Sequence, residues 1–166
     1  MQLSLAAILS TWAILAGVCA SQTVVPDHGT TTAPADGAAI APGDSFPFSF
    51  QPAPFGTQVC FSAYDGVNIY LSTSPPTAAD VTNTSCTLAS GSFVSDFGSY
   101  VVPHFSGLPP VGAGFPPSTF TMPTLNVTDD TTLYLSVIEI FNDCKACSAG
   151  GTVFFCGIET TTVVYA

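Results

Sequence analysis

Residues 45–51, SFPFSFQ, carry the clearest strand pattern in the chain. Phe46, Phe48 and Phe50 fall on one side of an extended backbone and polar residues fall on the other, which is typical of a half-buried strand. Pro47 lacks a backbone N–H, so the strand is expected to start there or to lie at the edge of a sheet. The stretch therefore predicts a β-strand with one face turned toward a core.

The segments after this strand continue the alternation of apolar and polar residues. Residues 57–63 and 67–73 are predicted to form a hairpin, because Asp65 and Gly66 between them are a typical tight-turn pair. The apolar positions of these strands, and of a later run at 131–141, predict the core. The predicted core residues are Phe46, Phe48, Phe50, Val59, Phe61, Ile69, Leu71, Leu133 and Leu135.

Residues 131–141 form the longest apolar run and predict a central strand. The alternation of this run breaks, and a β-bulge near Val137 would keep both apolar sets inward and turn Glu139 outward. No stretch places apolar residues at helical spacing. Many short strands with glycine and proline between them predict an all-β, Greek-key β-sandwich of about seven to nine strands. The remaining strands are expected around Phe93 and at 97–102, 118–121, 152–156 and 158–165.

A long link at 103–117, PHFSGLPPVGAGFPP, is rich in proline and glycine. Long loops in compact domains are often functional, which is one interpretation of this segment. The other interpretation is a proline-stiffened crossover between two sheets, and it is favoured because Greek keys commonly contain long crossovers.

Residues 1–20 are predicted to be a cleaved signal peptide. The run is largely apolar, and the tripeptide at 18–20 presents small residues before Ser21, as signal peptidase requires. A membrane anchor is the alternative, but no basic stop-transfer residues follow. We expect a flexible N-terminal segment at 21–35 and a β-sandwich domain at 36–166, both secreted.

The charge balance excludes several kinds of partner. The chain has 166 residues with Lys+Arg 1 and Asp+Glu 11, which gives a formal net charge of −10. A nucleic-acid binder needs clustered cations, and so does a protein that binds anionic lipid through a polybasic patch. We therefore expect no nucleic-acid binding and, after signal cleavage, no membrane binding.

Five cysteines follow the predicted cleavage site, and an extracellular compartment would oxidise them to disulfides. Because five is odd, at least one thiol stays unpaired or pairs with another chain. The spacing of Cys144 and Cys147 allows redox or metal chemistry, but no helix start or second pair accompanies it, so a structural role is favoured. The disulfide candidates are Cys60, Cys86, Cys144, Cys147 and Cys156, and the N-glycosylation sequons begin at Asn83 and Asn126.

A turn followed by an alternating strand opens the predicted domain. Its pattern consists of Pro34, Gly37, Ile40 and Gly43, followed by Phe46-x-Phe48-x-Phe50. This opening resembles that of small fungal secreted proteins with an immunoglobulin-like sandwich. It is more distantly similar to the N-terminal domain of yeast cell-wall glucan-synthesis proteins and of Ser/Thr-rich lipid-anchored wall proteins, although the chain lacks the tryptophan that often ends that strand and the Ser/Thr-rich tail. The resemblance implies an immunoglobulin-like fold outside the cell.

Residues that could catalyse a reaction are few and scattered. A copper polysaccharide oxygenase needs an N-terminal histidine, whereas the predicted mature chain begins with Ser21, and His28 is expected to be solvated. A serine triad would have to combine His104 with Asp65 or Asp96, but no Gly-x-Ser-x-Gly elbow is present.

A glycosidase would need two carboxyl groups on either side of a sugar. The acidic cluster consists of Asp129, Asp130, Glu139 and Asp143, and its first two members are expected to form a turn before the strand at 131. We therefore predict no catalytic residues, no cofactor and no metal site.

The sequence favours a secreted, non-enzymatic protein of the cell surface or extracellular space with a structural or interaction role. One alternative is a carbohydrate-binding module for a neutral wall polysaccharide, and another is a small extracellular hydrolase. The expected partner is a cell-wall polysaccharide or another extracellular protein. Asn68, Tyr70 and Tyr134 alternate with core residues, so they are predicted to share an exposed sheet face that could bind a glycan.

Overall fold

The structure is a computed structural model that describes residues 23–54, 63–82, 85–142 and 154–166. These segments hold ten strands, a single 3₁₀ turn (η1, Ala78–Asp80) and no α-helix. The all-β fold that the sequence predicts is confirmed. There are more strands than expected, because the Ser45–Gln51 stretch divides into two and the N-terminal segment adds two more.

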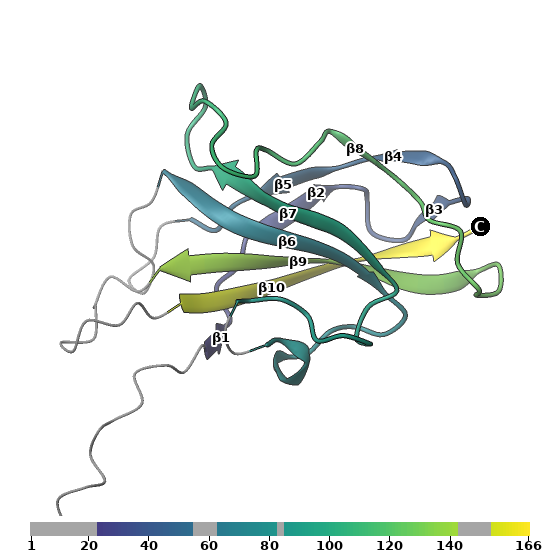
Figure 1. Cartoon of the computed structure of the whole chain (residues 1–166). Coiled ribbons are helices and arrows are strands. Elements are labelled where there is room, and N and C mark those ends of the chain that lie inside the picture. The colour runs from purple at the N-terminus through teal and green to yellow at the C-terminus, as the bar shows by residue number, and fades with distance from the viewer. Residues whose placement is uncertain (1–22, 55–62, 83–84, 143–153) are drawn as a thin grey trace, which may run out of the picture.

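The largest sheet is mixed and has six strands (Figure 1). Its order is β1-β10-β9-β6-β7, and β3 also pairs with β10. Strands β1 and β3 run parallel to β10, and all the other pairs are antiparallel. The bounds are Thr23–Val25 for β1, Ala38–Ile40 for β3, Tyr64–Ser72 for β6, Ser95–Pro103 for β7, Thr131–Asn142 for β9 and Phe154–Tyr165 for β10.

Two short antiparallel ladders form the second layer. Strand β2 (Thr30–Ala33) pairs with β5 (Ser49–Gln51), and β4 (Ser45–Pro47) pairs with β8 (Thr119–Thr121). The SFPFSFQ stretch thus changes its partner at Phe48, whose N–H donates to the carbonyl of Ser118 at 2.9 Å. The alternation of inward phenylalanines and outward residues continues through this change of partner.

The main core lies between the two layers. Phe46 and Phe48 are buried with Phe120 and Met122 from the second layer, and Phe50 packs against the same cluster half-buried. The predicted burial of Ile69, Leu71, Leu133 and Leu135 is confirmed, and the cluster also contains Val67, Val102, Val137, Val163 and Tyr165. Val59 and Phe61 lie outside the described residues.

The opposite face of the large sheet is also covered. The link between β6 and β7 packs Val81, Cys86 and Leu88 against Tyr70 and Ile138, and a disulfide joins Cys86 to Cys156 on β10. Because both faces of β9 are buried, its two apolar sets need no irregularity to reach a core.

The predicted β-bulge near Val137 is therefore wrong. Strand β9 pairs with β10 without a register shift from Thr131 to Asn142. Regular alternation places Glu139 on the inner face with Val137, and the side chain has no exposed surface. The expectation that Glu139 turns outward is wrong for the same reason.

The predicted turn at Asp65 and Gly66 is also wrong. Both residues lie inside β6 and pair with Val102 and Val101 of β7. A Cβ at Gly66 would lie 3.2 Å from a terminal methyl carbon of Ile140, so the glycine allows β9 to pack closely at this point. Most of the predicted 57–63 partner strand lies outside the described residues.

Where the structure describes it, at 23–35, the N-terminal segment forms strands and is not the flexible tail predicted for 21–35. Strand β1 pairs with residues Phe155 to Gly157 of β10, and β2 pairs with β5. The Thr- and Val-rich composition of both strands suits a pleated surface, and pairing with existing strands satisfies their backbone groups. The folded unit therefore includes residues before position 36.

The link between β7 and β8 connects the large sheet to the β4–β8 ladder, as a crossover between sheets does. It projects beyond the end of the sheet (Figure 1). The Gly114 carbonyl accepts the Val101 N–H at 2.9 Å, and the Tyr64 hydroxyl donates to the Pro109 carbonyl at 2.7 Å. These bonds anchor the link on β6 and β7.

Candidate functional site

Three titratable side chains meet at one end of the inner face of the large sheet. Asp65 comes from the start of β6, Glu139 from β9, and His104 from the first position after β7. Strand register brings them together, because Asp65 pairs with Val102 and Val67 pairs with Glu139. The Glu139 residue is 0% exposed, Asp65 is 3% exposed, and the His104 side chain is 5% exposed.

Both carboxylate oxygens of Glu139 accept backbone hydrogen bonds. The Gly29 N–H donates to Oε2 at 2.6 Å, and the Ala53 N–H donates to Oε1 at 2.9 Å. Gly29 lies in the link between β1 and β2, and Ala53 lies just after β5. One buried carboxyl group thus holds two segments of the chain on the sheet, through hydrogen bonds of the strong, charge-assisted kind when it is ionised.

Asp65 connects Glu139 to the histidine. The carboxyl groups of Asp65 and Glu139 lie close enough for each to perturb the pKa of the other. Two like charges this close disfavour ionisation of both groups together. On its other side, Oδ2 of Asp65 lies 2.5 Å from Nε2 of His104.

Burial dominates the protonation of this cluster, which we call the Glu139 cluster (Asp65, His104 and Glu139). It raises the pKa of Glu139 to about 7, against the opposing effect of the Ala53 hydrogen bond, and the charge of Asp65 adds to the rise. Burial also raises the pKa of Asp65 to about 6. For His104, burial lowers the pKa, and the charge of Glu139 opposes that effect. The carboxyl pair therefore retains its proton well above the usual carboxyl range.

Two glycines allow the chain to reach Glu139. Gly157 of β10 pairs directly with Glu139, and a Cβ there would lie only 2.4 Å from the Asp27 carbonyl oxygen. A Cβ on Gly29 would be closer still to the Gln51 carbonyl oxygen. The β1–β2 link thus crosses β10 where no side chain intervenes. No pattern in the sequence marks these glycines or Ala53, and Glu139 is marked only as an acid within an apolar run.

A depression of about 420 Å³ opens beside His104. Its other lining residues are Phe50, Gln51, Pro52, Ala53, Pro54 and Pro103. Glu139 does not line it, and its two oxygens are occupied by backbone N–H groups on the inner side. A molecule in this depression would therefore meet the imidazole and the proline-rich wall rather than the carboxyl pair.

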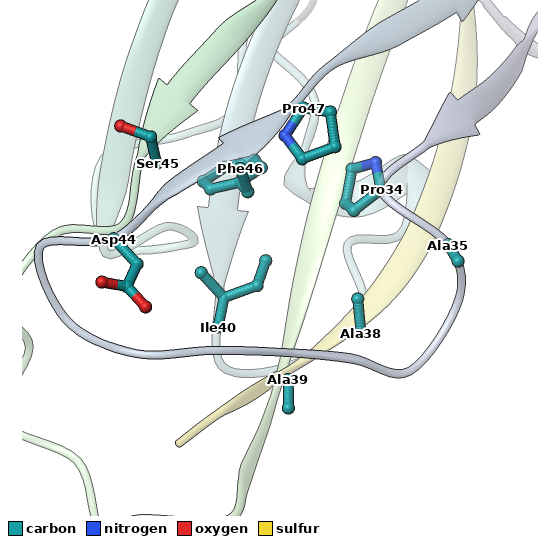
Figure 2. A pocket seen from close by; sticks show the side chains of 9 residues that line it. All are labelled: Pro34, Ala35, Ala38, Ala39, Ile40, Asp44, Ser45, Phe46 and Pro47. Carbon is teal, nitrogen blue, oxygen red and sulfur yellow. The ribbon is translucent and has the colours of Figure 1, made fainter.

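A second, smaller depression of about 240 Å³ lies between β3 and β4 (Figure 2). Pro34, Ile40, Phe46 and Pro47 supply most of its apolar lining, and Asp44 is the charged side chain among its lining residues. Its lining contains no nucleophile paired with a base, so it offers shape rather than chemistry.

The predicted glycan-binding face is wrong in two of its three residues. Asn68 and Tyr70 are buried beneath the β6–β7 link. The Asn68 amide donates to the Cys86 carbonyl at 2.8 Å and accepts from the Ser99 hydroxyl at 2.6 Å. Tyr134 is half-buried. The prediction failed because alternation separates the two faces of a sheet but does not show that a distant segment covers one of them.

Other predicted residues have mixed outcomes. The Cys86–Cys156 bridge is formed, whereas Cys60, Cys144 and Cys147 lie outside the described residues. Asn126 is exposed in a bend, as a glycosylation acceptor requires, and Asn83 lies outside the described part. His28 is exposed in the β1–β2 link.

The acidic residues considered for glycosidase chemistry do not form one site. Asp129 and Asp130 occupy the turn before β9, as predicted, and the Asp130 N–H donates to the Tyr165 carbonyl at 2.7 Å. Glu139 lies about 30 Å from Asp130 along β9 at the usual rise per residue. Asp143 is outside the described residues. Of the hypothetical serine triad, the structure brings together His104 and Asp65.

Comparisons with known proteins found no match to this chain among family models, curated proteins or solved structures. Within the described residues, no helix is long and apolar enough to cross a membrane. The same residues contain no group of three or more His, Cys, Asp or Glu side chains placed to hold a metal ion.

Proposed function

We propose that this chain is a secreted, non-enzymatic protein with an immunoglobulin-like Greek-key sandwich that acts by contact outside the cell. The observation that carries the proposal is the burial of Asp65 and Glu139, which keeps these two carboxyl groups from contact with a substrate. They are the strongest candidates for catalytic groups among the described residues. Glu139 is fully buried with both oxygens on backbone N–H groups, so its stabilising bonds would have to break before it could touch a substrate.

The strand order supports the immunoglobulin-like part of the proposal. Variable-type immunoglobulin domains carry strands G, F, C and C′ side by side in one sheet and A, B and E in the other. Here β10, β9, β6 and β7 follow one another as G, F, C and C′ would. The SFPFSFQ stretch pairs with β2 and β8 as strand B pairs with A and E.

The disulfide departs from the immunoglobulin pattern. In antibody domains the bridge joins the two sheets, whereas Cys86 and Cys156 join the β6–β7 link to the outer face of the large sheet. The bridge therefore lies on the sheet face that carries Tyr70, where the sequence predicted a glycan-binding surface. The fungal wall-protein resemblance and the predicted leader support an extracellular location for such a bridge.

The β7–β8 link is the contact surface that we propose. Phe105 is 44% exposed near the start of the link, and Val111 is exposed farther along it. Tyr64 and Phe115 pack at the base of the link with ring centroids 6.4 Å apart. Aromatic rings suit the apolar faces of sugars, and a chain of charge −10 disfavours anionic polymers, so a neutral wall polysaccharide is the proposed partner.

Substitution of the exposed ring tests this surface. The purified secreted protein is expected to bind at least one of insoluble chitin, cellulose and β-glucan, and Phe105→Ser should lower the bound fraction roughly fivefold. Val94→Ser is the matched control, because Val94 is 43% exposed elsewhere on the molecule. Absence of binding to all three polymers would remove the polysaccharide partner, and equal binding by Phe105→Ser would remove this surface.

Secretion is tested separately. Expression of the full chain in a eukaryotic secretory host is expected to release protein whose first residue is Ser21, because the apolar leader ends at an alanine-flanked site. Edman sequencing of protein from the medium checks this. Protein that stays in the cell with residues 1–20 attached would contradict the proposed location.

A further inference from the structure

We propose that the depression between β3 and β4 is a second contact site, which takes a lysine or arginine side chain from an extended basic segment of another protein. The site differs in position and in charge from the surface proposed on the β7–β8 link. Three observations support it. They are the apolar lining of the depression, the carboxylate of Asp44 beside that lining, and the edge of β4 that faces away from β8.

The depression exists because the N-terminal part of the chain changes layers beside β4. Strand β2 pairs with β5 in the second layer, whereas β3 pairs with β10 in the large sheet. The segment between β2 and β3 therefore crosses from one layer to the other. Among the described strands, β4 pairs with β8 alone, and a space of about 240 Å³ stays open between β3 and β4 (Figure 2).

The lining of this space suits the aliphatic stem of a long side chain. Ile40 and Phe46 belong to the main core, so the inner part of the depression is apolar. Asp44 lies on one side of Ile40, and Pro34 and Pro47 lie on the other (Figure 2). Lysine and arginine bury their aliphatic stems on apolar surface and keep the charged group in water. An apolar hollow with a carboxylate at one side fits this division.

Asp44 can meet the charged end of such a side chain. Its backbone is held in the turn before β4, because its N–H donates to the Ala41 carbonyl at 3.0 Å and its carbonyl accepts the Met122 N–H at 2.9 Å. The residue is exposed, and no hydrogen bond among the described residues occupies its carboxylate. A fixed backbone with an open carboxylate favours a charge-assisted hydrogen bond to a cation.

The charge of the chain indicates the kind of partner. The formal net charge is −10, and Lys145, which lies outside the described residues, is the one lysine or arginine in the sequence. A second copy of this chain could therefore offer only that side chain. A different protein with several basic residues fits better, since opposite net charges speed association and favour the correct partner.

The edge of β4 favours a peptide over other cationic polymers. The Phe48 N–H donates to the Ser118 carbonyl on β8, two residues along from the carbonyl of Phe46. The Asp44 carbonyl also bonds toward the β8 side. Because backbone groups alternate along an antiparallel strand, those of Ser45 point away from β8, on the side of the depression. An extended peptide can hydrogen-bond to such an edge while a side chain enters the pocket beside it.

NMR titration of the full secreted protein with a basic peptide tests the site. The probe is a short acetylated and amidated peptide of alternating lysine and serine, at low ionic strength, where attraction between charges is screened least. We expect saturable shifts of the Ala38, Ile40 and Ser45 amide signals with a Kd below about 1 mM. The same peptide with glutamate in place of lysine should cause no shift at these residues.

Substitution of the carboxylate separates this site from general attraction to an acidic protein. Asp44→Asn should weaken binding of the lysine peptide at least about fivefold, because it removes the charged acceptor. Asp129→Asn is the matched control: it makes the same change of charge in the exposed turn before β9 and should weaken binding less than about twofold. The unshifted amide signals of both variants should match those of the original protein, which shows that the fold is retained.

Three results would overturn the proposal. The first is the absence of saturable shifts, and the second is a set of largest shifts that lies outside the depression. Equal weakening by Asp44→Asn and Asp129→Asn is the third, because it would mean that the peptide senses net charge alone. A soluble glucosamine oligomer is the second probe, and tighter binding of this oligomer at the same amides would replace the protein partner by a cationic polysaccharide.

Discussion

Removal of the Cys86–Cys156 bridge is expected to lower the free energy of unfolding by about 4 kcal/mol. The two cysteines are 70 positions apart, and the chain-entropy relation for a loop of that length gives a loss of this size. The bridge also holds Val81 and Leu88 of the β6–β7 link over Tyr70 and Ile138, so its loss would expose an apolar face.

Urea unfolding of the Cys86→Ala/Cys156→Ala double variant measures this effect. Ser90→Ala, an exposed change in the same link, serves as the control and should leave the free energy within about 0.5 kcal/mol of the original. A loss below about 1 kcal/mol in the double variant would mean that the link holds its place on the sheet without the bridge.

Replacement of Gly157 by alanine is expected to cost about 3 kcal/mol. The new Cβ would lie 2.4 Å from the Asp27 carbonyl oxygen and 2.9 Å from the His28 Cβ, so the β1–β2 link would have to move away from β10. That movement would strain or break the Gly29 hydrogen bond to Glu139. Overpacking and loss of a bond to a carboxylate each contribute to the cost.

Gly66→Ala is the matched control for this change. Its Cβ would lie 3.2 Å from the end of the flexible Ile140 side chain, which can rotate away, so the expected cost is about 1 kcal/mol. Denaturant unfolding of both variants checks the difference. Equal costs at the two glycines would show that the β1–β2 link does not need to pass over Gly157.

The two expected losses concern opposite faces of one sheet. The bridge stabilises the covering link on the outer face, and Gly157 allows the N-terminal link to reach Glu139 on the inner face. A fold whose large sheet is covered on both sides leaves the projecting β7–β8 link as the more accessible place for contact (Figure 1).

The sequence predicted the strands that alternation marks strongly. The run at 131–141 is β9 almost to the residue, and Phe46, Phe48, Ile69, Leu71, Leu133 and Leu135 are in the core. The turn at Asp129 and Asp130 was also predictable, because local hydrogen bonding by aspartate favours a turn. These features depend on neighbouring residues, so the linear order of the chain contains them.

The errors have one physical origin. Asp65–Gly66 is a turn pair when taken alone, but pairing with β7 on one side and β9 on the other extends the strand through it. Asn68 and Tyr70 alternate as exposed residues do, yet a link from later in the chain covers them. The threonines and valines before position 34 become strands because β10 and β5 provide edges for them.

The sequence by itself determined the all-β class, the inward face of the strand at 45–51, the net charge and the cysteines available for bridging. The tertiary structure alone decided which side of each strand a second segment covers, and that Asp65, His104 and Glu139 meet. Alternation is a local property of the backbone with a period of two. Asp65 and His104 are 39 residues apart in the chain, and His104 and Glu139 are 35 apart. They meet only when β6, β7 and β9 pair in the correct register, and long-range pairing sets that register.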